Sequence, residues 1–81
     1  MGKTLGEKLK EARENKNLSI TELAKEVEVS EGAIRSYERN DADPAFFTLC
    51  CIATALDVSL DYLAGFTKEP KIHIEKEWMK I

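Results

Sequence analysis

The sequence has few of the residues from which catalytic and metal-binding sites are made. It contains one histidine, His73, and two cysteines, Cys50 and Cys51, which are adjacent in the chain. Adjacent cysteines are poorly placed for an ordinary disulfide, and one histidine elsewhere in the chain does not complete a zinc site. No nucleophile with a partner base and no phosphate-binding loop is recognisable. We therefore expect two structural thiols, no metal, no cofactor and no enzymatic activity.

Long apolar runs are also missing. No segment approaches the roughly 20 apolar residues of a membrane-spanning helix, and the N-terminus lacks the apolar core of a signal peptide. We therefore expect a cytoplasmic protein with no membrane partner, and no small-molecule ligand is evident. A chain of 81 residues is long enough for one small domain.

The sequence has no excess of basic residues. Its formal net charge is −3, distributed as +2 over residues 1–18, −2 over 19–40, −4 over 41–65 and +1 over 66–81. Domains that bind nucleic acids usually carry a basic face, because neutralising phosphates supplies much of their affinity. A protein with this charge would bind DNA weakly or through few, well-placed contacts.

Residues 20–39 (ITELAKEVEVSEGAIRSYER) have the apolar spacing of a helix-turn-helix. Helices at about 20–27 and 31–39 would each carry one apolar face, made of Leu23, Ala24, Val27, Ile34 and Tyr37. Ala24 falls where two steeply crossing helices come closest, so a larger side chain would force them apart. Val29 lies in the connection between the helices and can fill the gap there.

Capping residues support these helices and predict others. Ser19 and Glu22 form a capping box before the first helix of the motif, and Ser30 can cap the second. The same capping-box pattern recurs at Thr4 and Glu7, where another helix should begin. The further helices are expected at about 5–16, 45–56 and 60–64.

The expected helix at 45–56 should have Pro44 in its first turn, where the missing N–H costs nothing. Its inner face would be formed by Phe46, Leu49, Ile52, Ala53 and Leu56. Ser59 can cap the last short helix and Gly65 can end it. The predicted fold class is therefore all-α, with five helices.

The segment from Leu5 to Gly65 resembles the five-helix DNA-binding domain of the phage lambda repressor and Cro proteins, also called the xenobiotic-response-element family. The matching elements are LKEARENKNLS before the motif, SYER at its end and ALDVSLDYLAG near residue 65. The resemblance implies that residues 1–65 are a compact helix-turn-helix domain that reads double-stranded DNA in the major groove, usually as a homodimer. It implies a phage- or plasmid-type repressor acting on a two-fold symmetric operator. The alternative is a protein-interaction module that kept the fold with weak or no DNA binding, and the acidic motif supports it.

Carried over by position, the resemblance implies a set of DNA-facing residues: Thr21, Ser30, Glu31, Gly32, Arg35, Ser36, Arg39 and Asn40. Glutamine is common in the family at the places that hold Ile20, Glu31 and Gly32 here, so this sequence departs at three contact positions. Arg35 can reach a guanine edge or a phosphate, or it can pair with Glu31 one turn before it. Glu31 can accept from a cytosine amine, or it can simply favour the start of the helix.

Two further positions have structural roles in the resembled family. An arginine at the end of the first helix pairs there with a glutamate at the end of the recognition helix, and Arg13 and Glu38 stand at the matching places. The place of Glu28, in the turn of the motif, is usually glycine, because the backbone often has positive φ there. Either Glu28 adopts that conformation or the preceding helix runs one residue further.

Residues 66–81 (FTKEPKIHIEKEWMKI) lie beyond the resemblance. The alternation from Lys71 to Glu75 weakly predicts a short strand. This tail either folds back on its own domain, covers a partner or is disordered. The family places the end of the fifth helix beside the dimer axis, so dimerisation would involve that helix and the tail: Leu60, Tyr62, Leu63, Phe66, Ile72, Ile74, Trp78 and Met79.

Overall fold

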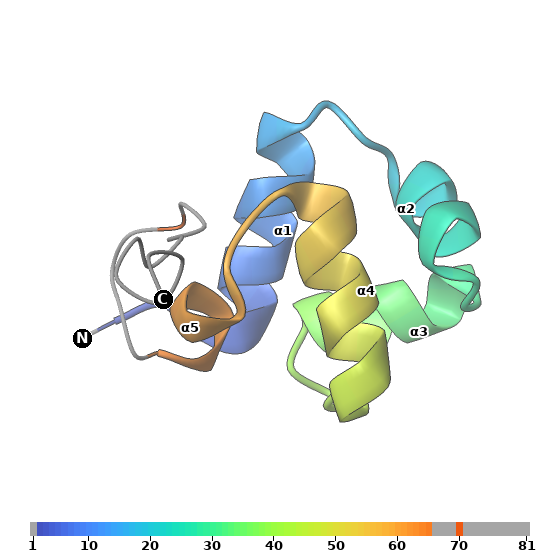
Figure 1. The fold of residues 1–81 in the computed structure, drawn as a ribbon. Coiled ribbons are helices and arrows are strands. Elements are labelled where there is room, and N and C mark those ends of the chain that lie inside the picture. Colours follow the sequence, from blue (N-terminus) through green and yellow to red (C-terminus); the bar gives the residue numbers. More distant parts are fainter. Residues whose placement is uncertain (1, 66–69, 71–81) are drawn as a thin grey trace.

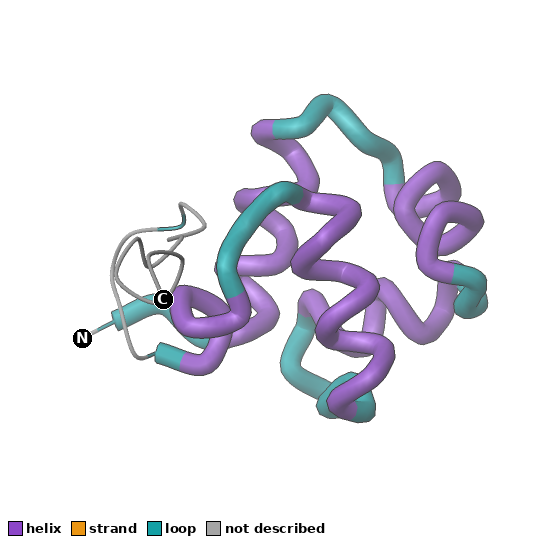
Figure 2. The backbone as a smooth tube through the Cα atoms, in the orientation of Figure 1, coloured by secondary structure: helices purple, strands orange, loops and turns teal. Residues whose placement is uncertain are grey.

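A computed structural model of the chain describes residues 2–65 and residue 70. It contains five helices: α1 (Leu5–Asn15), α2 (Ile20–Val27), α3 (Glu31–Glu38), α4 (Phe46–Leu56) and α5 (Leu60–Ala64). Figure 1 shows α2 and α3 on one side of the domain and α5 on the other, with α1 and α4 between them. Short loops join the helices, and no strand occurs in the described ranges (Figure 2). The predicted five-helix, all-α fold is confirmed.

One hydrophobic core joins all five helices. α1 packs against α3 and α5, α2 packs against α3 and α4, and α4 packs against α5. The apolar side chains predicted for the inner faces of α2 and α3 lie in or against this core. The buried apolar residues are Leu9, Ala12, Leu23, Ala24, Ile34, Ile52, Ala53, Leu56, Val58, Tyr62 and Leu63. None of the described helices is long and apolar enough to cross a membrane.

Both predicted capping boxes are present. The Thr4 hydroxyl accepts from the Glu7 N–H at 3.2 Å, and the Thr4 N–H donates to the Glu7 carboxylate at 2.8 Å. Ser19 and Glu22 make the same two bonds, at 3.0 and 2.8 Å. The donated backbone N–H lowers the pKa of each carboxyl from its usual value. A lowered folded-state pKa means that this stabilisation is present at neutral pH and is lost as the pH falls through that pKa.

The start of α4 differs from the prediction. The helix begins at Phe46, Ala45 is the N-cap without a side-chain hydrogen bond, and Pro44 precedes the cap. Phe46 does not belong to the inner face, since it is 75% exposed. Leu49 is the first residue of this helix that packs against the core, and Phe46 and Phe47 before it take no part in the core.

Glu28 adopts the left-handed backbone conformation, with φ 59° and ψ 44°, and α2 ends at Val27. The structure thus decides between the two alternatives that the sequence left open. Within residues 2–65, three other non-glycine residues have positive φ, and all three are Asn or Asp: Asn17, Asn40 and Asp57. Asn and Asp adopt this conformation more readily than longer side chains do. Glu28 therefore carries backbone strain of about 1–2 kcal/mol.

Replacing Glu28 by glycine should stabilise the domain. The substitution removes that strain, and the greater backbone entropy of glycine in the unfolded chain offsets part of the gain. We expect the free energy of unfolding in urea to rise by about 0.5–1 kcal/mol. The matched control is Glu26→Gly, inside α2, which should lower it by about 1 kcal/mol. Equal destabilisation by the two substitutions would contradict strain at Glu28.

Candidate nucleic-acid interface

The connection between α2 and α3 fixes the angle at which α3 leaves the core. The Val29 N–H donates to the Ala24 carbonyl at 3.0 Å and closes the turn after α2. Ala24 is buried, and Val29 packs against the core. Ile34 is 1% exposed and holds the inner face of α3. The opposite face of α3 is therefore presented to solvent.

The first turn of α3 is open for contact. The Ser30 hydroxyl caps the helix by accepting from the Ala33 N–H at 3.0 Å. Gly32 is exposed, and a Cβ added there would meet only the Ser30 hydroxyl, at 3.9 Å. Neither packing nor a positive φ requires a glycine at this position. Its effect is to leave the backbone of α3 uncovered by a side chain on the outer face. Ser36 is half-buried one turn further along the helix.

Both arginines of the motif have a carboxylate partner. Arg35 Nη2 lies 3.3 Å from Glu31 Oε1, so the i,i+4 pair considered for Arg35 is formed. Arg39 Nε lies 3.2 Å from Asp41 Oδ2. All four side chains are substantially exposed, so these pairs contribute little to stability. They do lower the positive potential that α3 offers to a phosphate.

A groove beside α3 collects basic side chains from two helices. It has a volume of about 320 Å³ and is lined by Lys10, Arg13, Ile20, Arg35, Glu38 and Arg39. Lys10 is exposed on α1 and was not among the DNA-facing residues expected from the sequence. An exposed lysine on a helix is a weak signal of DNA contact, because most such side chains are simply solvated. Lys10, Arg35 and Arg39 make this groove a basic surface beside α3.

The family follows from this arrangement and from direct comparison. The sequence model of the helix-turn-helix family matches residues 9–63, which is more than half of the chain. The chain belongs to the lambda repressor/Cro-like helix-turn-helix family. No group of three or more His, Cys, Asp or Glu side chains that could hold a metal occurs among residues 2–65 and 70.

Relatives of known structure match this helix-turn-helix domain along most of their length. The P22 c2 repressor in complex with a synthetic operator is 32% identical with a TM-score of 0.74, and the match covers 76% of this chain and 94% of that one. SinR in complex with DNA is also 32% identical, with a TM-score of 0.71 and coverage of 75% and 98%. ImmR, a transcriptional regulator of Bacillus subtilis, is 36% identical over 76% of this chain but only 49% of its own length. The chain spans about half to two thirds of the length of the first curated relatives that it matches.

The Arg13–Glu38 pair expected for this helix-turn-helix family is present. Arg13 Nε and Nη2 donate to the two oxygens of the Glu38 carboxylate at 2.6 and 3.1 Å, and Nη1 donates to the Leu18 carbonyl at 2.8 Å. The two side chains are 10% and 7% exposed. The hydrogen bonds to Glu38 outweigh burial and raise the pKa of Arg13 above its ordinary value. The pair ties the end of α1 to the end of α3.

Two more ties between the same helices were not predicted for this helix-turn-helix domain. The Gly6 N–H donates to Asn40 Oδ1 at 2.9 Å, and Asn40 Nδ2 donates to the Thr4 hydroxyl at 2.9 Å. Asn40 therefore anchors the start of α1. A DNA contact by its side chain stays a prediction, and it would have to use the hydrogen-bonding capacity of the amide that these two bonds leave unused. Gly6 is buried, and a Cβ there would lie 2.6 Å from the Tyr37 carbonyl oxygen and closer still to that of Glu38.

The residues expected at the dimer interface of this helix-turn-helix protein fall into two groups. Tyr62 and Leu63 are buried in the core of the single chain, and Leu60 is half-buried. Lys8 Nζ donates to the Tyr62 carbonyl at 2.9 Å and lies 5.1 Å from the centre of its ring, so α5 is held against α1. The others lie outside the described residues: Phe66, Ile72, Ile74, Trp78 and Met79. A dimer contact stays a prediction for all of them, and Tyr62 and Leu63 offer little free surface for it.

Proposed function

We propose that this chain is a sequence-specific DNA-binding transcriptional regulator that inserts the first turn of α3 into the major groove. The observation that supports this most strongly is the exposed face of α3 beside the basic groove. Packing at Ile34 and the tie at Glu38 hold the helix rigidly, and its outer residues have no role in the core. The similarity to the P22 c2 repressor and SinR, both solved in complex with DNA, supports DNA binding by this chain.

The contacts divide into two kinds. Residues of the first turn, with Arg35, would meet base edges, and Thr21 with Arg39 and Lys10 would meet phosphates on either side of α3. The net charge of −3 and the carboxylates beside Arg35 and Arg39 mean that affinity rests on few contacts. We therefore expect binding that is strong only at low salt or at a matching site.

A homodimer on a two-fold symmetric operator, in the manner of a phage repressor, would compensate for this low affinity. Two recognition helices about 34–36 Å apart engage successive major grooves. Linking two weak contacts raises the overall affinity without any new contact, because the second binding event becomes intramolecular.

Substituting the two arginines of α3 tests this function. An operator selected from random-sequence DNA at low salt would be titrated with the wild type, Arg35→Ala and Arg39→Ala. Arg35→Ala should weaken operator binding by about 1–3 kcal/mol and reduce discrimination between sequences. Arg39→Ala should weaken binding to all sequences alike and make the dependence on salt less steep.

Glu14→Ala, at an exposed position of α1, is the control. It should change neither the affinity for the operator nor the salt dependence of binding. Sedimentation of the complex should give two protein chains for each operator duplex. Absence of DNA binding by the wild type at low salt would reject the proposed function. A wild type that binds with a single chain would reject the homodimer alone.

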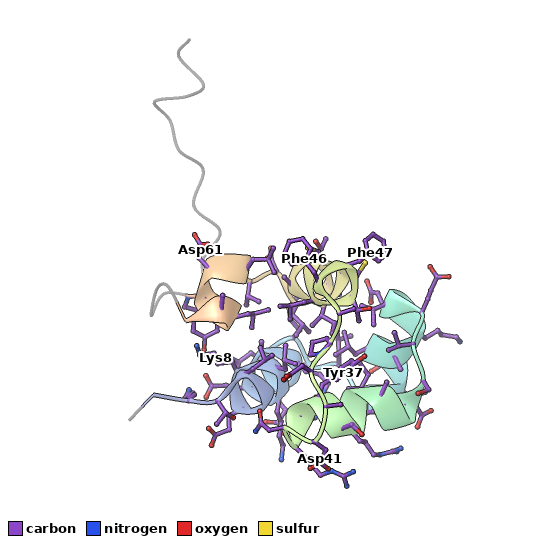
Figure 3. The ribbon with its side chains drawn as sticks, turned by 90° about the horizontal axis from the view of Figure 1, so that it is seen from below. Lys8, Tyr37, Asp41, Phe46, Phe47 and Asp61 are labelled. Atoms are coloured by element: carbon purple, nitrogen blue, oxygen red, sulfur yellow. The ribbon has the colours of Figure 1, made fainter. Side chains whose placement is uncertain are left out.

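One observation favours a second candidate, a protein-interaction module. Phe46 and Phe47, the first residues of α4, are 75% and 79% exposed, and Figure 3 shows both rings on the side of α4 away from α3 and Asp41. No basic residue occurs between residues 40 and 65, so this surface is unsuited to DNA. A folded wild type that fails to bind DNA would favour this role.

A further inference from the structure

The two exposed ion pairs of the α3 region, unlike the buried Arg13–Glu38 pair, differ in where they lie. Arg39 and Asp41 are at the C-terminal end of α3. Glu31 lies in the first turn of α3 and Arg35 one turn further along the helix, and the N-terminal part of a recognition helix is the part that meets base edges. The Glu31–Arg35 pair therefore stands where sequence is read, and the Arg39–Asp41 pair stands where phosphates are met.

The Glu31–Arg35 pair does little for stability. Its side chains are 43% and 51% exposed, and exposed i,i+4 pairs contribute only a few tenths of a kcal/mol. What the pair does change is the direction of Arg35, because the contact draws the guanidinium toward the first turn of α3. Only Nη2 of Arg35 is within hydrogen-bonding distance of Glu31, so the other N–H donors of the guanidinium remain free.

The surface around this pair is open toward a ligand. Gly32 follows Glu31 and has no side chain, and the space beside it is empty out to the Ser30 hydroxyl at 3.9 Å. Nothing at position 32 would keep the backbone of α3 away from a base edge. Arg35 can therefore reach a base while its guanidinium still contacts Glu31.

We propose that Glu31 is a positioning residue that directs Arg35 onto a guanine of the operator half-site. The inference rests on the proposed function and names the base that α3 selects. A guanidinium donates two parallel hydrogen bonds to O6 and N7 of guanine, whereas adenine places an amine donor where O6 would be. The Glu31 carboxylate adds a penalty for other arrangements, because it repels phosphates and the acceptor atoms of bases whenever Arg35 is not placed between them.

Glu31 therefore lowers affinity for DNA in general while it raises preference for one base. The test measures dissociation constants for the selected operator and for the same duplex with the guanine pair changed to an adenine pair. In the wild type the two should differ by roughly 5- to 150-fold. In Glu31→Ala, and in Glu31→Gln, which keeps the side-chain volume, that ratio should fall several-fold while binding to unrelated DNA becomes tighter.

The matched control is Asp41→Ala, which removes the carboxylate beside Arg39. If carboxylates act only by repelling phosphates, both substitutions tighten binding to every sequence and leave the ratio unchanged. We expect that result for Asp41→Ala alone. Circular dichroism of each variant should be that of the wild type, since both residues are exposed.

The double variant Glu31→Ala with Arg35→Ala separates action through Arg35 from direct reading. The inference requires the ratio in the double variant to equal that in Arg35→Ala. An unchanged ratio in Glu31→Ala, or a further fall when Arg35 is already alanine, would overturn it while leaving DNA binding intact. A wild type that binds no DNA would instead remove the proposed function itself.

Discussion

Replacing Arg13 by alanine should lower the free energy of unfolding by about 3–5 kcal/mol, because it leaves the buried Glu38 carboxylate without its partner. The Leu18 carbonyl loses a donor at the same time. A domain of this size has a total stability of only about 4–12 kcal/mol. The variant should therefore be largely unfolded at temperatures where the wild type is folded, as thermal and urea unfolding would record.

The pairing itself is tested by a double-mutant cycle. Glu38→Ala should cost about as much as Arg13→Ala, and the double variant should cost clearly less than the sum, because neither charge is then buried alone. The exposed pair supplies the control, since Arg35→Ala should change stability by less than about 0.5 kcal/mol. Strictly additive losses for Arg13 and Glu38 would show that the two side chains do not act together.

Replacing Gly6 by alanine should have the second largest effect. The added methyl group would overlap the carbonyl oxygens of Tyr37 and Glu38, and these backbone atoms can move only if α3 moves. We expect a loss of about 3 kcal/mol, at the upper end of typical overpacking costs, and a displaced α3 that binds DNA less well.

Gly32→Ala is the control for Gly6→Ala, because it places the same methyl group on a helix in open space. It should raise the free energy of unfolding by up to about 1 kcal/mol through helix propensity. Urea unfolding of both variants makes the comparison. Similar stabilities for the two variants would contradict a close contact between α1 and α3 at Gly6.

The sequence predicts best what depends on neighbouring residues. The capping boxes at Thr4 and Ser19 involve residues three apart, and the inner faces of α2 and α3 follow from apolar spacing, so both can be predicted without a structure. The Arg13–Glu38 pair joins distant parts of the chain, and only the resemblance to known repressors predicted it.

The prediction was wrong or silent where the outcome depends on how distant helices meet. Phe46 fits the apolar spacing of α4, but in the folded chain its ring is exposed on the side of α4 away from α3, which spacing does not reveal. Nothing in the sequence around Gly6 shows that a side chain is excluded there, because the atoms that exclude it belong to α3. The resemblance implies that Asn40 lies beside the DNA backbone, which stays a prediction, but it gives no hint of the bonds from Asn40 to Gly6 and Thr4 in the folded chain.

The ties between α1 and α3 bear on how operator preference can change during evolution. All of them meet α3 in its last turn or just after it, at Tyr37, Glu38 and Asn40. Glu31, Gly32 and Arg35, which are proposed to face bases, take no part in those ties. Substitutions at Glu31, Gly32 and Arg35 should therefore retarget the protein to new DNA sequences while leaving the scaffold that orients α3 unchanged.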